Sequence, residues 1–473
     1  MSTYRKILTF LPEVRAPGHK QTLKKRLLWT FTILLLFLFL AAIPLYGVES
    51  TQAEYFKTLE LLLGAKIGKL LTLGIGPIVT GSIVLQLLKG AGVVKFDLST
   101  EDGKFIYNGT LKLMVMAFII LESIVYVSFG AVSAAKPELF WVVSLQMALG
   151  GFIVLFMDEI VKKWGFGSGV SLFIAAGIGQ AVFLKLFSPF TQAGTLGWGF
   201  GGSEPTVGKF FAGLYYLSVG EPQTFFTAVV GPVGITVMLF FLIVFFQSVN
   251  VEIPLSFGRV RGQSIRWPLN FFYSGVIPVI LISALGANLK LWSRLLQNIA
   301  EKADSSAFVR FISENIFGQF QGSTPVSGFV SWIQYVDLWS NLYNFFTLSV
   351  WPHILSYTMY LIIGSTLFAY FWVQTAGLDS RSQAKQIINS GLQIPGFRKD
   401  ERIIERILDR YILPLTIMGG VGVGLLASTA NLLTALTSGT GILLMVMIIY
   451  QFYKQLAKES MDDFSLLRRF MRK

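Results

Sequence analysis

Cysteine is absent from the 473-residue sequence, and histidine occurs only at His19 and His353. Disulfides and thiolate metal sites are therefore excluded. A histidine metal site is not expected either, because the two histidines are far apart in sequence and are predicted on opposite sides of a membrane. HExxH, CxxC and phosphate-loop motifs are absent, and GFGSGVS at 165–171 lacks the G-x-S-x-G spacing of a nucleophile elbow. We expect neither an enzyme nor a bound cofactor or metal.

Charge is also scarce, since only 14% of the residues are charged whereas 53% are hydrophobic, and the mean hydropathy is +0.63. Soluble domains carry about a quarter charged residues. Nine apolar runs are long enough to span a bilayer, and a tenth run, 71–88, is interrupted. The nine are 27–46, 108–131, 139–157, 169–187, 225–247, 268–289, 350–373, 412–434 and 438–457. We predict an all-α polytopic membrane protein with ten transmembrane helices.

The first apolar run has basic residues before it and Ala41–Ala42 after its core, as a signal peptide would. However, its length of about 20 residues exceeds a typical signal core of about 7–15 residues, and 26 residues precede it. We therefore interpret 27–46 as a membrane span.

Basic residues are distributed unevenly between the predicted loops. If the N-terminus is cytoplasmic, 29 of the 39 Lys and Arg residues lie on the cytoplasmic side. Cytoplasmic loops carry the excess of positive charge in membrane proteins. This distribution predicts a multi-pass protein of the cell membrane with both termini in the cytoplasm, and hence an even number of crossings.

The ten runs divide into two groups of five, within 27–187 and 225–457, on either side of the glycine-rich external segment 188–224. An odd number of crossings per half makes the second half enter the membrane from the opposite side. Such inverted halves are common where a pathway runs between them. We expect an N-terminal half over 1–187, an external hinge loop over 188–224 and a C-terminal half over 225–473.

The interrupted run reads LTLGIGPIVTGSIVLQLL, with Gly74, Gly76 and Pro77 near its start. The helix that remains after Pro77 is about 18 Å long, against a hydrocarbon core of about 30 Å. The preceding stretch, EYFKTLELLLGAKIGKLL at 54–71, has apolar residues at helical spacing. It is either an external amphipathic helix or a re-entrant segment. Non-helical backbone at membrane depth must be buried in protein or face water, which favours the re-entrant interpretation.

An intramembrane carboxylate and two groups of basic residues are further candidates for a functional role. Glu122 lies in the middle of the third run; it is either a functional carboxylate or, as we favour, a structural group hydrogen-bonded to Thr80 or Gln86. Two cytoplasmic loops, within 248–268 and 373–411, place Arg and Lys beside Gly or Pro. Their charge fits topology alone and docking to nucleic-acid phosphates equally well.

On residue patterns alone, a secondary transporter and a channel are equally compatible with the broken helix and the inverted halves. An intramembrane protease is disfavoured, because no nucleophile–base spacing or aspartate pair occurs in the runs. Ile75 and Val79 share one helix face, as do Val170 and Ile174. Aliphatic pairs of this kind are expected to serve packing.

The chain resembles a known family over nearly its whole length, and four segments show the resemblance most clearly. They are LTLGIGPIVTGSIVLQLL, DEIVKKWGFGSGVSLFIAAG (158–177), VIPVILISALGAN (276–288) and GLQIPGFRKDERIIERILDRYI (391–412). In order, they resemble the second, fifth and seventh transmembrane segments and the loop between segments eight and nine of the SecY family. LPEV near the N-terminus makes the chain similar to the archaeal-type members.

The resemblance implies a protein-conducting channel with ten transmembrane helices in two inverted five-helix halves and a re-entrant plug helix at about 54–66. Such a channel conducts unfolded secretory polypeptides and releases hydrophobic segments laterally into the bilayer. The implied pore ring consists of Ile75, Val79, Val170, Ile174, Ile280 and Leu444. The implied plug residues are Glu54, Leu59, Leu62, Gly64 and Ile67. The implied lateral gate lies between 75–90 and 268–289, with Thr80, Gln86 and Glu122 as its polar residues.

The same resemblance implies partners: a SecE-like gamma subunit, a small beta subunit, and a ribosome whose RNA phosphates would contact Arg259, Arg261, Arg398 and Lys399. One position departs from the family. Val276 occupies a place where members often carry an asparagine that completes a polar cluster with the counterparts of Thr80 and Glu122. Gate closure in this chain is therefore expected to depend on other contacts.

Overall fold

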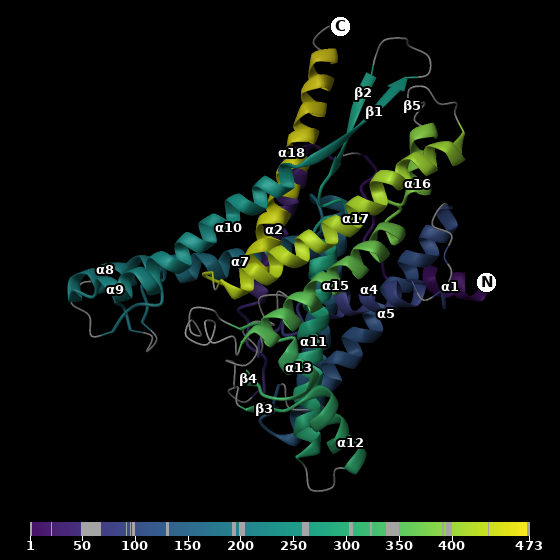
Figure 1. The fold of residues 1–473 in the computed structure, drawn as a ribbon. Helices are drawn as coiled ribbons and strands as arrows, with labels where there is room; N and C mark the ends of the chain where they lie inside the picture. The colour runs from purple at the N-terminus through teal and green to yellow at the C-terminus, as the bar shows by residue number, and fades with distance from the viewer. Residues whose placement is uncertain are drawn as a thin grey trace.

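The helices cross near the centre of the molecule, and α10 (Gly231–Ser248), α11 (Ile277–Ala300) and α18 (Gly439–Phe470) extend from there to the left, bottom and top of the view (Figure 1). The computed structural model describes residues 2–19, 21–48, 68–90, 92–94, 96, 100–128, 132–191, 195–197, 204–257, 264–301, 306–321, 324–336, 350–389, 392–393, 400–433 and 435–470. Within these ranges, eight helical segments are long and apolar enough to cross a membrane. The protein is therefore a multi-pass membrane protein.

Each of the eight segments corresponds to one of the uninterrupted apolar runs. They are α5 (Glu101–Ser128), η2 with α6 (Pro137–Leu139 and Phe140–Trp164), α7 (Gly169–Phe187), α9 through η3 to α10 (Pro222–Phe225, Phe226–Val230 and Gly231–Ser248), α11 (Ile277–Ala300), α15 with α16 (Trp351–Thr375 and Ser380–Asn389), α17 (Glu401–Leu432) and α18 (Gly439–Phe470). The observed bounds of α7 coincide with the predicted run 169–187.

The remaining two of the ten predicted spans are shorter helices. The first is α2, Leu23–Leu40, with 18 residues, and the second is α4, Gly76–Gly90, with 15 residues. At helical rise α4 is about 22 Å long, so the interruption before it does leave a short helix, as predicted. The full count of ten crossings remains a prediction.

The seventh run was predicted to begin too early. The helix α11 starts at Ile277 rather than near 268, because 264–270 form strand β2 and Gly275, with φ of +69°, makes the turn into the helix. A positive φ is readily adopted by glycine. Nine residues of the predicted span therefore lie outside the helix.

The two large loops contain a small sheet that the all-α prediction did not include. Strand β1 (Asn250–Phe257) pairs antiparallel with β2 (Ser264–Asn270) and with β5 (Leu392–Gln393), in the order β2-β1-β5. Ile253 and Leu269 are buried in a second hydrophobic core with residues of α16 and α17. The described parts of the loops 248–268 and 373–411 therefore belong to one folded body. A two-stranded hairpin, β3 (Phe320–Gln321) and β4 (Thr324–Pro325), lies elsewhere.

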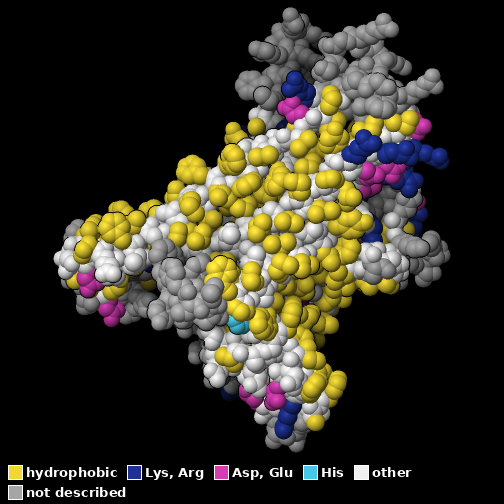
Figure 2. Space-filling view, in the orientation of Figure 1, with side chains coloured by type: hydrophobic (Ala, Val, Ile, Leu, Met, Phe, Trp, Pro, Cys, Tyr) yellow, Lys and Arg dark blue, Asp and Glu magenta, His cyan; other side chains and the backbone are white. Residues whose placement is uncertain are grey.

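Short helices complete the described elements. They are α1 (Ser2–Thr9), α8 (Lys209–Val219), α12 (Ala307–Phe311), η4 (Ile312–Phe317) and α13 (Gly328–Trp332). In Figure 1 the β1–β2–β5 sheet and α16 lie toward the top and right, whereas α8, α9, β3, β4 and α12 lie toward the left and bottom. Hydrophobic side chains dominate the surface between these ends, over α10, α17 and α15 (Figure 2).

The main hydrophobic core draws residues from both predicted halves. Between the halves, α7 contacts α18, and α4 contacts α11 and α15. Within the second half, α17 crosses α15 at close range: a Cβ added at Gly420 would lie 2.7 Å from Thr366 Cα, and one at Gly424 would lie 2.7 Å from Ile362 Cα. Small residues allow two helix backbones to approach in this way.

Candidate functional site

The backbone interruption before α4 is fully enclosed by protein. Leu71, Thr72 and Leu73 are at most 1% exposed, and Gly74 adopts a φ of +52°. Successive turn hydrogen bonds, including Gly74 N to Leu71 O and Gly76 N to Leu73 O, both 3.0 Å, satisfy the backbone. Irregular backbone at membrane depth requires such burial.

The helix α6 makes room for this interruption with two adjacent glycines. A Cβ added at Gly150 would lie 1.9 Å from the carbonyl oxygen of Leu70, and one at Gly151 would lie 3.2 Å from a methyl of Leu73. Any larger residue at Gly150 would collide with backbone. The glycines at 150 and 151 therefore leave space for the irregular backbone at 70–73. Helical periodicity in the sequence does not reveal this fit.

All six predicted ring residues belong to, or pack against, the main hydrophobic core, which also contains many other residues of the spanning helices. The six are Ile75, Val79, Val170, Ile174, Ile280 and Leu444. Five are at most 5% exposed, and Val170 is half-buried against the same core. They come from both predicted halves, since α4 and α7 precede residue 188 whereas α11 and α18 follow residue 224. The predicted ring members therefore share one apolar environment.

A buried polar cluster lies on the same helix α4. The Thr80 hydroxyl accepts a hydrogen bond from Asn288 Nδ2 of α11 at 3.2 Å and donates to the Gly76 carbonyl at 3.0 Å. Glu122 of α5 is 9% exposed and shares a side-chain hydrogen bond with Thr80. Thr80 thus joins two helices of the first half to α11 of the second.

Two of the sequence-based expectations concern this cluster. The asparagine beside Thr80 is Asn288, so the amide that Val276 was expected to leave missing is supplied from farther along α11; Val276 itself is buried and apolar. Gln86, by contrast, does not join. Its buried Oε1 finds no hydrogen-bond partner among the described residues.

An ion pair that sequence reasoning did not identify joins α2 to α18. Both nitrogen–oxygen contacts from Arg26 Nη1 to the Glu459 carboxylate are 2.7 Å. Arg26 Nε also donates to the carbonyl of Gly165 at 2.9 Å, and its guanidinium lies 5.4 Å from the centre of the Phe166 ring. These partners are separated by up to 433 residues in sequence, so no local pattern points to them.

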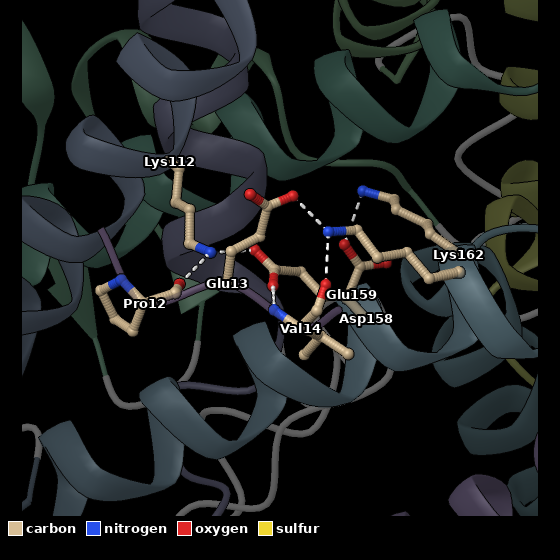
Figure 3. Close-up of polar contacts among 8 residues, drawn as sticks. Pro12, Glu13, Val14, Lys112, Asp158, Glu159 and Lys162 are labelled. Atoms are coloured by element: carbon tan, nitrogen blue, oxygen red, sulfur yellow. Dashed lines mark hydrogen bonds and ion pairs between the residues drawn. The ribbon is translucent and has the colours of Figure 1, made fainter. Parts of the chain in front are cut away.

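A second network holds the N-terminal segment 11–15 against α5 and α6 (Figure 3). Lys112 of α5 pairs with Glu159 and also donates to the Pro12 carbonyl. Glu159 accepts from the Val14 backbone nitrogen at 3.1 Å. Lys163 pairs with Glu13, and the hydrogen bond from Lys163 lowers the pKa of the Glu13 carboxyl. The segment containing LPEV is thus anchored to the first half.

Pairing of β1 with β5 brings the two basic loops side by side. Ser256 pairs with Gln393 and Phe257 with Leu392. The predicted docking residues Arg259, Arg261, Arg398 and Lys399 lie outside the described residues. The predicted plug at about 54–66, with Glu54, Leu59, Leu62, Gly64 and Ile67, also lies outside them.

The arrangement defines a class of protein: a multi-pass helical membrane protein whose helices share one large hydrophobic core and include a short helix that follows a buried backbone break. Among the residues that the structure describes, no group of three or more acidic or histidine side chains is placed to hold a metal ion.

Comparison with known proteins identifies the family. The SecY family model matches residues 69–453. Protein translocase subunit SecY of Methanothermobacter thermautotrophicus is 37% identical over 480 residues, covering 99% of this chain and 98% of that protein. The corresponding subunit of Methanocaldococcus jannaschii is 36% identical over 458 residues, covering 97% and 96%. The chain belongs to the SecY family.

Solved structures agree with this assignment. A structure described as that of a protein-conducting channel superposes with a TM-score of 0.79 at 35% identity, covering 96% of both chains. Sec61 in the canine ribosome-channel complex from the endoplasmic reticulum superposes with a TM-score of 0.75 at 34% identity, again covering 96% of both chains.

Proposed function

We propose that this chain is the central pore-forming subunit of a protein translocase, which conducts unfolded secretory polypeptides across the cell membrane and releases hydrophobic segments into the bilayer. The observation that supports the proposal is the buried break before α4: Ile75 and Val79 lie in the main hydrophobic core together with the other predicted ring residues, which come from both halves. Family membership supplies the expected substrate, and these aliphatic side chains would form a constriction that fits it.

Branched aliphatic side chains suit such a constriction for two reasons. They make no directional hydrogen bonds, so they can close around a chain of any sequence. A narrow apolar constriction also tends to lose its water, which opposes the passage of ions. No reaction is required of this subunit, and a ribosome or another energy source would give the movement its direction.

The lateral gate would open between α4 and α11, where Thr80 and Asn288 are hydrogen-bonded across the two halves. An apolar segment that enters lipid through this gate gains about 25 cal/mol for each Å² of apolar surface removed from water. The family resemblance places a plug at about 54–66, which would close the channel below the ring.

The proposed topology has ten crossings in two inverted halves, 1–187 and 225–473, joined by the external hinge 188–224, with both termini cytoplasmic. The eight observed spans together with α2 and α4 support this count. On this topology the folded body of β1, β2, β5, α16 and the start of α17 projects into the cytoplasm.

We assign ribosome docking to this cytoplasmic body. Solved relatives include Sec61 in a ribosome-channel complex. Strand pairing places the 248–268 and 373–411 loops together, so Arg259, Arg261, Arg398 and Lys399 would act on one patch of RNA phosphates. A SecE-like gamma subunit and a small beta subunit are the further proposed partners.

A cysteine crosslink tests the proposed channel, because the chain has no native cysteine. Val79→Cys is combined with ribosomes stalled on a secretory chain that carries one cysteine, over a series of chain lengths. A disulfide is expected only at lengths that place the nascent cysteine in mid-membrane.

Leu121→Cys is the matched control. Leu121 lies beside Glu122 on α5, but its side chain is on the outer surface and 53% exposed. No crosslink should form there at any length. If Val79→Cys also fails to crosslink while a cysteine in a cytoplasmic loop succeeds, Val79 is a packing residue and the pore assignment is wrong.

A further inference from the structure

The carboxylate of Asp158, near the end of α6, contacts the beginning of the next helix. Asp158 is 2% exposed, and its Oδ1 accepts a hydrogen bond from the backbone nitrogen of Val170 at 3.0 Å. Its Oδ2 lies 2.6 Å from Lys162 Nζ, one turn farther along α6. The two oxygens of one buried carboxylate therefore have different partners, and Figure 3 shows the contact with Lys162.

The start of α7 has no side-chain cap of its own. Ser168 occupies the cap position but makes no side-chain cap hydrogen bond. The first N–H groups of a helix lack partners within the helix and require other acceptors. Asp158 satisfies the Val170 N–H from a neighbouring helix, and its negative charge lies where the helix dipole favours it.

The contact between the two helices is as close as backbone allows. A Cβ added at Gly169 would lie 2.6 Å from Asp158 Cα and 2.8 Å from Asp158 Oδ1. Glycine at 169 is therefore required for the carboxylate to reach the Val170 N–H. Asp158 of α6 is therefore in direct contact with the first turn of α7.

That turn carries Val170, one of the six aliphatic side chains of the proposed ring, and a second one, Ile174, lies one turn farther along α7. We infer that Asp158 is a positioning residue for the ring: by holding the Val170 N–H, it keeps these two side chains at the radius that closes the resting channel. This inference rests on the proposed pore function, and it identifies what holds one side of the ring in place.

Ion pairs and a hydrogen bond of neighbouring residues hold the end of α6 in place. Glu159, the next residue, pairs with Lys112 of α5 and accepts from the Val14 backbone nitrogen. Lys163 pairs with Glu13. The end of α6 is thus bound to α5 and to the N-terminal segment on one side, and through Asp158 to α7 on the other.

Ion leakage tests the inference. The full chain, purified from membranes with the subunits that accompany it, is reconstituted into K⁺-loaded liposomes, and resting K⁺ efflux is measured. Asp158→Leu removes the acceptor, and we expect efflux to rise about 10-fold, as for a hydrogen bond to a charged group; this factor corresponds to about 1.4 kcal/mol.

Two matched variants distinguish the effect of the hydrogen-bond acceptor on efflux from the effect of the negative charge. Asp158→Asn retains an oxygen for the Val170 N–H and loses the negative charge, so efflux should stay well below that of Asp158→Leu. Lys162→Gln removes the ion pair but leaves the carboxylate, and Lys162 is 52% exposed, so this variant should match the wild type. Leakage through Asp158→Asn equal to that through Asp158→Leu would overturn the inference.

Gly169→Ala provides a second approach if Asp158→Leu fails to assemble. Its methyl group would push the turn away from Asp158 without altering the carboxylate, and efflux should again increase. Wild-type efflux from both assembled variants would refute the positioning role. The Val79→Cys crosslink, repeated in the same preparations, separates this outcome from failure of the pore assignment, because the crosslink does not depend on Asp158.

Discussion

The Thr80 hydroxyl forms hydrogen bonds with residues of three helices, α4, α5 and α11. It accepts from Asn288, donates to Gly76 and shares a hydrogen bond with Glu122. Thr80, Asn288 and Glu122 are all buried, so removing the hydroxyl leaves polar groups without a partner. An unsatisfied buried group costs about 1–3 kcal/mol. The cost falls on the closed arrangement, because α4 and α11 lie on opposite sides of the proposed gate.

We therefore expect Thr80→Val to weaken the closed gate. Export of a reporter with a defective signal sequence should rise several-fold relative to the wild type, because less binding energy is then needed to separate α4 from α11. Ser82→Ala is the matched control, since the Ser82 hydroxyl bonds only within α4, to the Ile78 carbonyl. Equal export through both variants would assign Thr80 a role in folding alone.

Among the helices, the crossing of α15 and α17 depends on glycine. At Gly424 an added Cβ would lie 2.7 Å from Ile362 Cα and 2.6 Å from Ser365 Oγ. Backbone atoms cannot move aside as a flexible side chain can, so the whole crossing must open. Overpacking of this kind costs about 1–3 kcal/mol.

The expected result of Gly424→Ala is a lower thermal stability of the detergent-solubilised protein, measured by the loss of monodisperse protein on heating. Gly234→Ala in α10 is the control, because a Cβ added there meets nothing within 4 Å. Alanine is a better helix former than glycine, so the control should be unchanged or more stable. A stable Gly424→Ala protein would show that α15 and α17 can separate without cost.

At the scale of the whole molecule, the two proposed halves are connected by Arg26 and Glu459 as well as at the gate. Both nitrogen–oxygen distances are 2.7 Å, and the two side chains are 23% and 32% exposed. Charge-assisted contacts of one arginine with two carboxylate oxygens are among the stronger polar interactions. This pair therefore ties the start of α2 to α18.

A double-mutant cycle of Arg26→Gln and Glu459→Gln should give a coupling free energy of about 1–2 kcal/mol in unfolding of the solubilised protein. Arg5 and Asp102 form the comparison pair; their side chains are 59% and 72% exposed. Exposed pairs contribute about 0–1 kcal/mol. Coupling at Arg26 and Glu459 no larger than in the comparison pair would show that the two halves do not depend on this contact.

The broken helix shows which features could be predicted from the sequence and which could not. Gly74, Gly76 and Pro77 predicted the interruption, and α4 does begin at Gly76. Backbone preferences are local, so they are visible in the sequence. The same residues could not reveal that Gly150 of α6 accommodates Leu70, because that contact joins distant parts of the chain. The β1–β5 pairing was missed for the same reason.

The sequence by itself determined the membrane class, the positions of the apolar runs and the family, because hydrophobic length, charge and motif wording are properties of the chain alone. Only the tertiary structure decided which side chains meet. It selected Asn288 rather than position 276 as the partner of Thr80, excluded Gln86 from that cluster and placed Asp158 at the first turn of α7. These contacts join different helices, and their geometry depends on how the helices cross.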